Sequence, residues 1–255
     1  MIAKTEAIVL RSMKYGETSR ILTLYTRDFG RMSVIVKGAR AAKSKFGMAL
    51  DVMSHSAVVM YVKEQRELQL LTQADLIEQY RGIVEHPERL MYGFALLEFL
   101  SATVHGEEAH EELYEVLVSS LAALDAAEAR PANILLHYLL RLIHALGLAI
   151  DARHCTRCRA DLSHEQALRG HASFSERQGG FTCSDCLPAA DAKRVAIETV
   201  GALRWLDTHA VAQSATLALS PRAASEALQL LQQHLREHLP EMRQVKSLSM
   251  LDLFS

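Results

Sequence analysis

The sequence predicts an α+β protein of several domains, with a small closed β-barrel at the N-terminus and an all-α domain that carries a four-cysteine, zinc-ribbon-like module. Three observations support this class. Apolar residues alternate with period two over residues 1–80 and recur with a period near 3.6 afterwards, and two C-x-x-C pairs lie within residues 151–190. A chain of 255 residues, 49% of them hydrophobic, is long enough for two or three domains.

Five strands are expected within residues 1–80, the first predicted domain. The segments AIVLRSMK, SRILTLYT and RMSVIVKG form a meander, because turn sequences separate them. A long basic connection follows, and HSAVVMYVK and ELQLLTQA supply the fourth and fifth strands. Five short strands of this kind suit a small barrel, since closure removes exposed strand edges.

Helices are expected after residue 80, where turn signals become sparse. Pro87 suits the first turn of a helix that runs to Val104, a second helix spans Glu108 to Ala127, and Pro131 starts a broadly apolar helix that ends near Gly147. These helices place the first part of the helical domain at residues 81–150. Residues 191–255 form its second part, with helices at about 192–209 and 221–238 and a C-terminal tail.

The charge is unevenly distributed along the chain. Residues 1–45 hold ten Lys and Arg against three Asp and Glu, a net charge of +7. Because the whole chain carries −2, the remainder carries −9. This asymmetry predicts a basic N-terminal surface that attracts a polyanion, and the alternative is ordinary scatter of surface charge.

A cytoplasmic protein without a membrane partner is expected. No run of eighteen apolar residues occurs, because His137, Arg141 and His144 interrupt the most apolar segment. The N-terminus alternates polar and apolar residues and lacks the apolar region of a signal peptide.

Residues 151–190 predict a structural zinc site. Each C-x-x-C turn brings two thiolates to one ion, and four cysteines complete a tetrahedron that leaves no open position for a reacting water. The expected ligands of one Zn²⁺ are Cys155, Cys158, Cys183 and Cys186. A redox dithiol and free buried cysteines are the alternatives, and His154, His164 or His171 could replace a sulfur. The segment FSERQGGFTC is expected to form a hairpin that presents the second pair.

Small barrels of this type hold single strands with cations and with aromatic rings on which bases stack. The segment Gly38–Gly47 (GARAAKSKFG) combines small residues with cations, which is typical of a loop that follows phosphates. An ordinary solvated loop is the alternative. Five rings are available, each of which could instead belong to the core: Tyr15, Tyr25, Phe29, Phe46 and Tyr61.

Enzyme signatures are missing from the sequence. It contains no Walker A motif, no G-x-G-x-x-G, no G-x-S-x-G and no H-E-x-x-H. The cluster from His105 to Glu112 resembles a metal motif only in composition, because Gly106 separates its histidines and they do not share a helix face. A protein that is not an enzyme is therefore expected.

The order of these features resembles the RecO family of bacterial DNA repair proteins, which are recombination mediators. The most specific stretch is ETSRILTLYTRDFGRMSVIVKGAR, followed by a basic loop and Phe46–Leu50. The helices, the LGLAID segment and the four-cysteine module extend the similarity over nearly the whole chain.

The resemblance implies an OB fold in residues 1–80, binding of single- and double-stranded DNA, annealing of complementary strands, and loading of RecA onto gaps coated by single-strand-binding protein (SSB). It implies RecR and the acidic SSB tail as partners, a bacterial cytoplasmic location at the nucleoid, and a role in the SOS response to DNA damage. The residues to which it assigns DNA binding are Arg20, Lys37, Arg40, Lys43 and Lys45, with Arg31 next. The pocket for the acidic tail cannot be placed, because the apolar helix offers only Arg141.

The end of the chain supports a separate hypothesis. Met250–Phe254 (MLDLF) resembles the short tails by which bacterial proteins dock on the replication sliding clamp, with Leu251, Leu253 and Phe254 as the contact residues. The usual leading Gln is absent, and the alternative is a tail that folds back onto the helices.

Two other classes of function compete with DNA repair. A protein-interaction adaptor would use the barrel and the zinc module as a scaffold, and would bind DNA weakly with little dependence on salt. A metalloenzyme would need an open metal position, which four cysteine ligands do not offer.

Overall fold

The computed structural model describes residues 1–63, 66–104, 106, 108–162, 171–186, 189–240, 242 and 245–247. The chain divides into two compact units, of which the first comprises Met1–Asp125 and Val245–Ser255 and the second comprises Ala126–Gln244. Each unit combines helices with a sheet. The finer division at residues 80, 150 and 190 stays a prediction.

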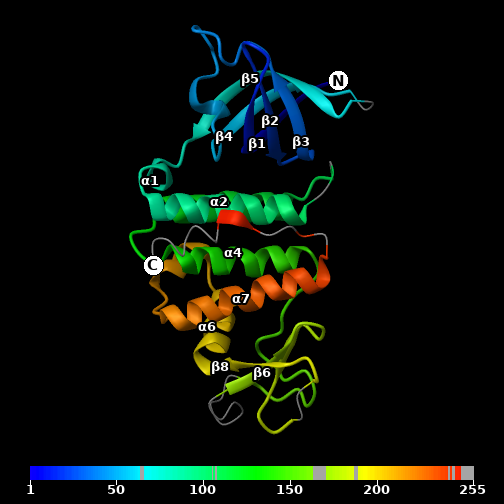
Figure 1. Ribbon diagram of the computed structural model, residues 1–255, viewed down its shortest axis with the longest axis vertical. Helices are drawn as coiled ribbons and strands as arrows, with labels where there is room; N and C mark the ends of the chain where they lie inside the picture. Colours follow the sequence, from blue (N-terminus) through cyan, green and yellow to red (C-terminus); the bar gives the residue numbers. More distant parts are fainter. Residues whose placement is uncertain are drawn as a thin grey trace. The chain divides into compact units, whose positions relative to one another are not determined.

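The first unit contains the five-stranded barrel that the sequence predicted. Its strands are β1 (Ile2–Tyr15), β2 (Ser19–Thr26), β3 (Gly30–Val36), β4 (His55–Tyr61) and β5 (Leu68–Glu78). They close in the order β1-β2-β3-β5-β4, as Figure 1 shows in blue and cyan. Residues Ile2–Ile8 of β1 pair with β4 and Ala7–Tyr15 pair with β2, and a register shift between Val9 and Arg11 interrupts the pairing with β2. Such a bulge bends a strand, which lets one strand take part twice in a closed sheet.

Alternation along the strands separates a packed interior from an outer wall. Leu22 and Leu24 of β2 and Val34 and Val36 of β3 are fully buried, whereas the residues between them are partly exposed. Phe46 and a short 3-10 helix, η1 (Gly47–Leu50), pack against the same core. The barrel therefore has a filled interior, and its outer wall and its loops are the surfaces that can bind a ligand.

The barrel is joined within the described residues of the first unit by the helices α1 (Arg81–Val84), α2 (Pro87–Thr103) and α3 (Glu111–Asp125). Tyr114 of α3 joins this layer to the barrel, because its hydroxyl lies 3.0 Å from Nε2 of His55. Nε2 of His55 also lies 3.3 Å from Oε2 of Glu6. The Arg27 guanidinium pairs with Glu115 of α3 and lies 5.3 Å from the centre of the Tyr114 ring. Polar contacts thus fix the barrel on α3.

The C-terminal segment returns to the first unit. The backbone N–H and the hydroxyl of Ser247 both donate to Oε2 of Glu98 on α2, each at 3.0 Å. Val245 and Ser247 are buried. A tail that folds back onto the helices was the alternative for the end of the chain, but the pairing of Ser247 with Glu98 was not predicted.

The second unit is organised around α4 (Pro131–Ala145), which is buried along most of its length, as its breadth of apolar residues predicted. It packs against α6 (Ile197–Thr208), a 3-10 helix η2 (Val211–Thr216) and α7 (Pro221–His238). A three-stranded sheet accompanies them, with the order β7-β6-β8. Its strands are β6 (His171–Ser175), β7 (Gly180–Thr182) and β8 (Lys193–Ala196).

One helix boundary predicted from the sequence was wrong. Residues 192–209 were assigned to a helix, but Lys193–Ala196 form β8, and α6 begins at Ile197. The strand forms because β6 offers it an antiparallel partner, with Ala172 opposite Val195. Such pairing between distant segments has no local sequence signal.

The helices α6 and α7 cap each other. Oε2 of Glu226 on α7 accepts hydrogen bonds from the Ala196 N–H, at 3.0 Å, and from the Thr199 hydroxyl at the start of α6. Glu198 of α6 accepts from the N–H and the hydroxyl of Ser220, both at 2.7 Å, at the start of α7. Carboxylates at helix N-termini satisfy unpaired N–H groups and interact favourably with the helix dipole.

Glu226→Gln is expected to destabilise the second unit by about 1–2 kcal/mol, because the uncharged amide keeps the shape but weakens the hydrogen bonds to α6. Urea unfolding followed by the fluorescence of Trp205, the only tryptophan, measures the change. Glu237→Gln on α7 is the matched control, since Glu237 forms an exposed ion pair with Arg177 of the β6–β7 turn. Equal stability of both variants would contradict the capping role.

None of the helices in the described part of the chain combines the length and the apolar character needed to cross a lipid bilayer.

Candidate metal centre and nucleic-acid surface

The four predicted cysteines come together in the second unit. The sulfurs of Cys155, Cys158, Cys183 and Cys186 all lie within 4.8 Å of one another, and those of Cys158 and Cys183 are 3.7 Å apart. Tetrahedral zinc, with Zn–S distances of about 2.3 Å, needs sulfurs about 3.8 Å apart. The arrangement can hold one metal ion.

Two turns and a hairpin position the sulfurs. The first turn closes through hydrogen bonds from the Arg159 N–H to the Cys155 carbonyl, at 3.0 Å, and from the Cys155 N–H to the Ala160 carbonyl, at 2.9 Å. The expected hairpin is present as β6 and β7, and Cys183 follows β7 directly. A Cβ on Gly180 would lie 2.6 Å from Cγ2 of Thr156, so glycine lets the first turn approach the hairpin closely.

The pKa values of the thiols differ widely within the cluster. Burial acts to raise the pKa of Cys155, but backbone N–H groups of Cys158 and Cys183 outweigh it and lower that pKa to about 6. Contacts with the Cys158 and Cys183 sulfurs raise the pKa of Cys186 to about 12. Four thiolates therefore do not form together at neutral pH unless a positive ion offsets their repulsion.

The histidines near the cysteines have other partners. Nδ1 of His154 lies 3.3 Å from the Asp151 carboxylate, and His171 lies against the Arg194 guanidinium. Among the described residues, no histidine joins the four-cysteine group, and His164 lies outside them.

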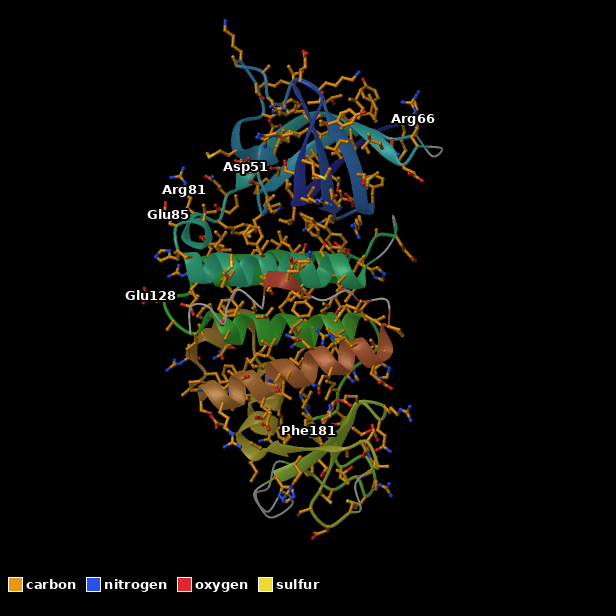
Figure 2. The ribbon with its side chains drawn as sticks, viewed as in Figure 1. Asp51, Arg66, Arg81, Glu85, Glu128 and Phe181 are labelled. Carbon is orange, nitrogen blue, oxygen red and sulfur yellow. The ribbon has the colours of Figure 1, made fainter. Side chains whose placement is uncertain are left out.

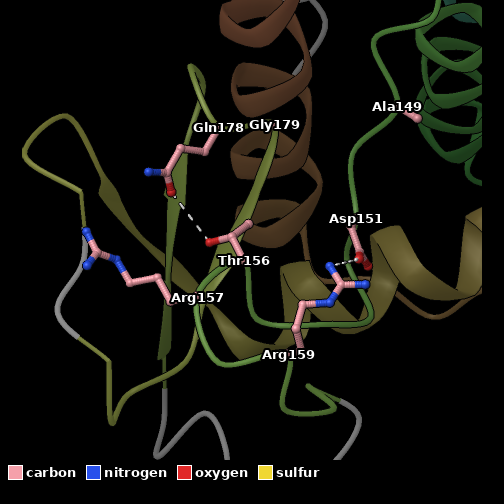
Figure 3. Close-up of a pocket in the computed structure, with 7 residues that line it drawn as sticks. All are labelled: Ala149, Asp151, Thr156, Arg157, Arg159, Gln178 and Gly179. Carbon is pink, nitrogen blue, oxygen red and sulfur yellow. Dashed lines mark hydrogen bonds and ion pairs between the residues drawn. The ribbon is translucent and has the colours of Figure 1, made fainter.

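The arginines around the first cysteine pair do not form a single cationic site. A hollow beside the hairpin, of about 560 Å³, is lined by Arg157 and Arg159 among others. Figure 3 shows that Arg159 turns toward Asp151, 3.6 Å away, whereas Arg157 points away from this pair. Arg153 pairs with Asp207 at 3.8 Å. The contribution of Arg157 to the metal site comes from its backbone N–H, which lowers the pKa of Cys155.

The basic connection between β3 and η1 lies on the surface of the barrel. Lys37, Arg40, Lys43 and Lys45 are all exposed, and within the described residues the lysines form no ion pair. Arg40 anchors the connection to the β1–β2 turn, because its N–H donates to the Thr18 carbonyl at 2.8 Å and its Nη1 to the Gly16 carbonyl at 3.2 Å. Lys45 lies 5.4 Å from the centre of the Phe46 ring. The connection therefore presents exposed cations, of which Arg40 is held by backbone carbonyls.

The other two predicted DNA contacts are already engaged within the protein. Nη1 of Arg20 lies 3.2 Å from the Asp51 carboxylate, and both side chains are partly exposed. Nη1 of Arg31 donates to the Ser101 carbonyl of α2 at 3.1 Å, and Arg31 is half-buried. Arg20 can exchange its partner for a phosphate, whereas Arg31 would leave a helix carbonyl unpaired.

The structure sorts the five candidate rings. Tyr25 and Phe46 are buried, and Phe29 packs against the barrel core. Tyr15 and Tyr61 are exposed to 53% and 47%. Only these two of the five rings are accessible to a base.

The hypothesis of a clamp-binding tail cannot be compared with the structure, because Leu251, Leu253 and Phe254 lie outside the described residues.

The fold and the site define a class of protein: an OB-like barrel with an exposed basic connection, followed by a helical region with four cysteines placed to hold a metal ion. Comparison with known families gives the same order. Residues 1–80 match the family described as Recombination protein O N terminal, and residues 84–249 match Recombination protein O C terminal.

Individual relatives match over the same length. The chain is 31% identical to DNA repair protein RecO of Chloroherpeton thalassium, with 97% of this chain and 96% of the relative covered. It is 32% identical to DNA repair protein RecO of Chlorobaculum parvum, with 98% of each covered, and 33% identical to that of Rubrobacter xylanophilus, with 93% and 92% covered. The chain belongs to the RecO family.

Proposed function

We propose that this protein is a recombination mediator without catalytic activity, which binds single- and double-stranded DNA, anneals complementary strands and helps to load RecA on SSB-coated DNA. The observation that carries the proposal is the exposed connection with Lys37, Arg40, Lys43 and Lys45 in a chain of the RecO family. Exposed cations on the barrel attract a phosphate backbone regardless of its sequence.

Annealing by this protein needs no chemical step. Two DNA strands repel each other through their phosphates, and base pairing supplies the free energy once they meet. Cations on an exposed, small-residue connection reduce this repulsion, because they replace the counterions of both strands. The protein then acts by lowering the barrier to encounter.

The proposal includes the partners and the metal. RecR, RecA and the C-terminal tail of SSB are the protein partners, and the protein acts in the bacterial cytoplasm, at the nucleoid. The metal is one structural Zn²⁺ held by the four cysteines, since four protein sulfurs leave no position for a substrate or a reacting water.

Replacing Lys37, Arg40, Lys43 and Lys45 together by Ala is expected to weaken binding to a fluorescent single strand at least tenfold at physiological salt. Each lost phosphate contact also lowers the slope of log affinity against log salt by about 0.7 for a single strand, so the slope falls by about 3. Fluorescence anisotropy across a salt series measures both quantities.

The matched control replaces four exposed cations of the second unit by Ala: Arg177, Lys193, Arg222 and Arg236. This variant is expected to keep the affinity and slope of the unmodified protein. An equal loss in both variants would show that net charge, and not the basic connection, determines binding. Weak binding of the unmodified protein with almost no salt dependence would favour the adaptor.

A further inference from the structure

An apolar row winds once around the outer wall of the closed barrel, beginning and ending on β1. Strand register places Met13 opposite Ile21, Ile21 opposite Ile35, Ile35 opposite Leu70, Leu70 opposite Tyr61 and Tyr61 opposite Ile2. We call these six residues the apolar belt: Met13, Ile21, Ile35, Leu70, Tyr61 and Ile2. The belt follows the hydrogen-bonding direction across all five strands.

The belt residues point outward. Their sequence neighbours Leu22, Val36 and Met60 are fully buried in the barrel core, and side chains alternate between the two faces of a strand. Ile2, Tyr61 and Met13 are exposed to 60%, 47% and 43%, and the other three are half-buried. The belt is therefore not part of the core.

Cations lie at both ends of the belt, and its six side chains carry no charge. Lys14 follows Met13 at the β1–β2 turn, where Arg40 is also anchored. Lys63 and Arg66 flank the β4–β5 connection next to Tyr61, and Figure 2 shows Arg66 projecting there.

On one side of its middle, the outward residues next to the belt are hydroxyl-bearing or apolar, and on the other side the exposed Lys37 follows β3 two residues after Ile35. Thr23 lies opposite Ser33, and Ser33 lies opposite Leu68.

We propose that the apolar belt binds the unpaired bases of a DNA strand while the phosphates contact the cations at its two ends. The inference rests on the proposed function and adds a site that recognises the unpaired state. Five inter-strand gaps of about 4.8 Å give the belt a length of about 24 Å. At about 3.4 Å per nucleotide of a stacked strand this length holds about seven nucleotides, within the range of about 4–16 found for one OB fold.

The apolar side chains of the belt are suited to contact with unpaired bases. Unpaired bases expose apolar faces, and burial of these faces against aliphatic side chains and one ring is favourable. Hydroxyls of Thr23 and Ser33 can donate to base edges or accept from them. A duplex hides its base faces in the stack, so only the end cations can hold it.

This difference favours release of the annealed product over release of the single strands. Two strands bound through their bases lose the belt contacts when they pair, whereas the phosphate contacts remain. The duplex product therefore binds more weakly than the single strand and is released.

The test compares two probes of equal length and charge: a fluorescent 20-mer of thymidine and a 20-mer of abasic sugar phosphates with the same label. Tyr61→Ser and Ile35→Ser together are expected to weaken binding of the thymidine strand about tenfold, since one lost base contact alone has an effect of this size. Binding of the abasic strand and the salt slope should not change. Tyr61→Phe should bind like the unmodified protein, because it keeps the ring.

Leu76→Ser is the matched control, because Leu76 is an apolar β5 residue that is 40% exposed and lies outside the belt. Circular dichroism and urea unfolding establish that each variant is folded. An equal loss for both probes, or no loss for either, would overturn the belt proposal.

A variant that binds both probes normally but changes its sedimentation would show a protein interface on this wall, which also overturns the proposal. If the unmodified protein binds neither probe, the proposed function fails as well.

Discussion

Cys183→Ser is expected to abolish metal binding and to unfold the sheet that carries the cysteines. Cys183 is buried and its sulfur lies 3.7 Å from that of Cys158, so a serine hydroxyl removes a soft ligand from the middle of the cluster. The three remaining cysteines bind zinc more weakly, and the free energy of metal binding, about 10–16 kcal/mol for small structural zinc sites, is largely free energy of folding.

The loss is expected to spread from the metal centre to α6. Strand β8 pairs with β6 and continues directly into α6, so disorder of the sheet releases the start of that helix. Trp205 lies on α6, and its fluorescence therefore reports the change. Metal content by mass spectrometry, limited proteolysis and Trp205 fluorescence of the full chain are the measurements. We expect about one Zn²⁺ per unmodified chain.

His154→Ala is the matched control for the metal experiment. His154 is next to Cys155 but pairs with Asp151, so its variant should keep the metal and resist protease like the unmodified protein. Removal of the metal with a chelator should reproduce the Cys183→Ser pattern without any mutation. A Cys183→Ser protein that retains one metal ion and the unmodified protease pattern would show that the cysteines do not form a structural site.

Local patterns predicted the barrel and the metal ligands because both have short-range signatures. The turns between the first three strands are encoded by adjacent residues, and a C-x-x-C turn places two sulfurs together whatever the rest of the chain does. The strand β2 matches its predicted span, Ser19–Thr26, for this reason.

Features that depend on distant residues were not predictable. Strand β8 needs β6 as its partner, and the docking of Ser247 needs Glu98, which is 149 residues away. Arg31 looked like a free cation in the sequence, but its position next to the Ser101 carbonyl depends on how α2 packs on the barrel.

The apolar belt does have a local signal, which the sequence analysis did not use. In RILTLY and SVIV, apolar residues occupy both faces of the strand, and Ile21 and Ile35 were the surplus residues on the outer face. Clean alternation of apolar and polar residues is expected for a barrel whose outer wall faces only water. Apolar residues on the outer face of a strand therefore indicate a binding surface on the barrel, provided that the strand register places these residues next to one another.

Stability of the second unit is expected to fall by about 3 kcal/mol between neutral pH and about pH 4, because of His137 alone. This α4 side chain is only 6% exposed, and burial lowers its pKa from 6.5 to about 4. A hydrogen bond to the His209 carbonyl, 3.1 Å from Nε2, opposes the shift without cancelling it. Nδ1 is buried and has no hydrogen-bond partner within the described residues, so protonation there would create an unpaired charge.

The loss of stability at low pH follows from the number of protons that the folded and unfolded states bind. The unfolded chain binds a proton at His137 below about pH 6.5, whereas the folded protein does so only below about pH 4. Between these values the unfolded state binds more protons, so stability decreases as the pH falls through this window and is constant above it. Burial also lowers the pKa of His234 on α7, which acts in the same direction.

His137→Gln separates this effect from acid release of the metal. Its amide can still donate to the His209 carbonyl but does not titrate, so the variant should lose about 2 kcal/mol less than the unmodified protein between pH 7 and pH 5. Urea unfolding followed by Trp205 fluorescence measures the difference, and both proteins keep the same four cysteines. His110→Gln, at an exposed position of the first unit, should leave the pH dependence unchanged. Parallel pH profiles for His137→Gln and the unmodified protein would show that His137 is not the acid-sensitive group.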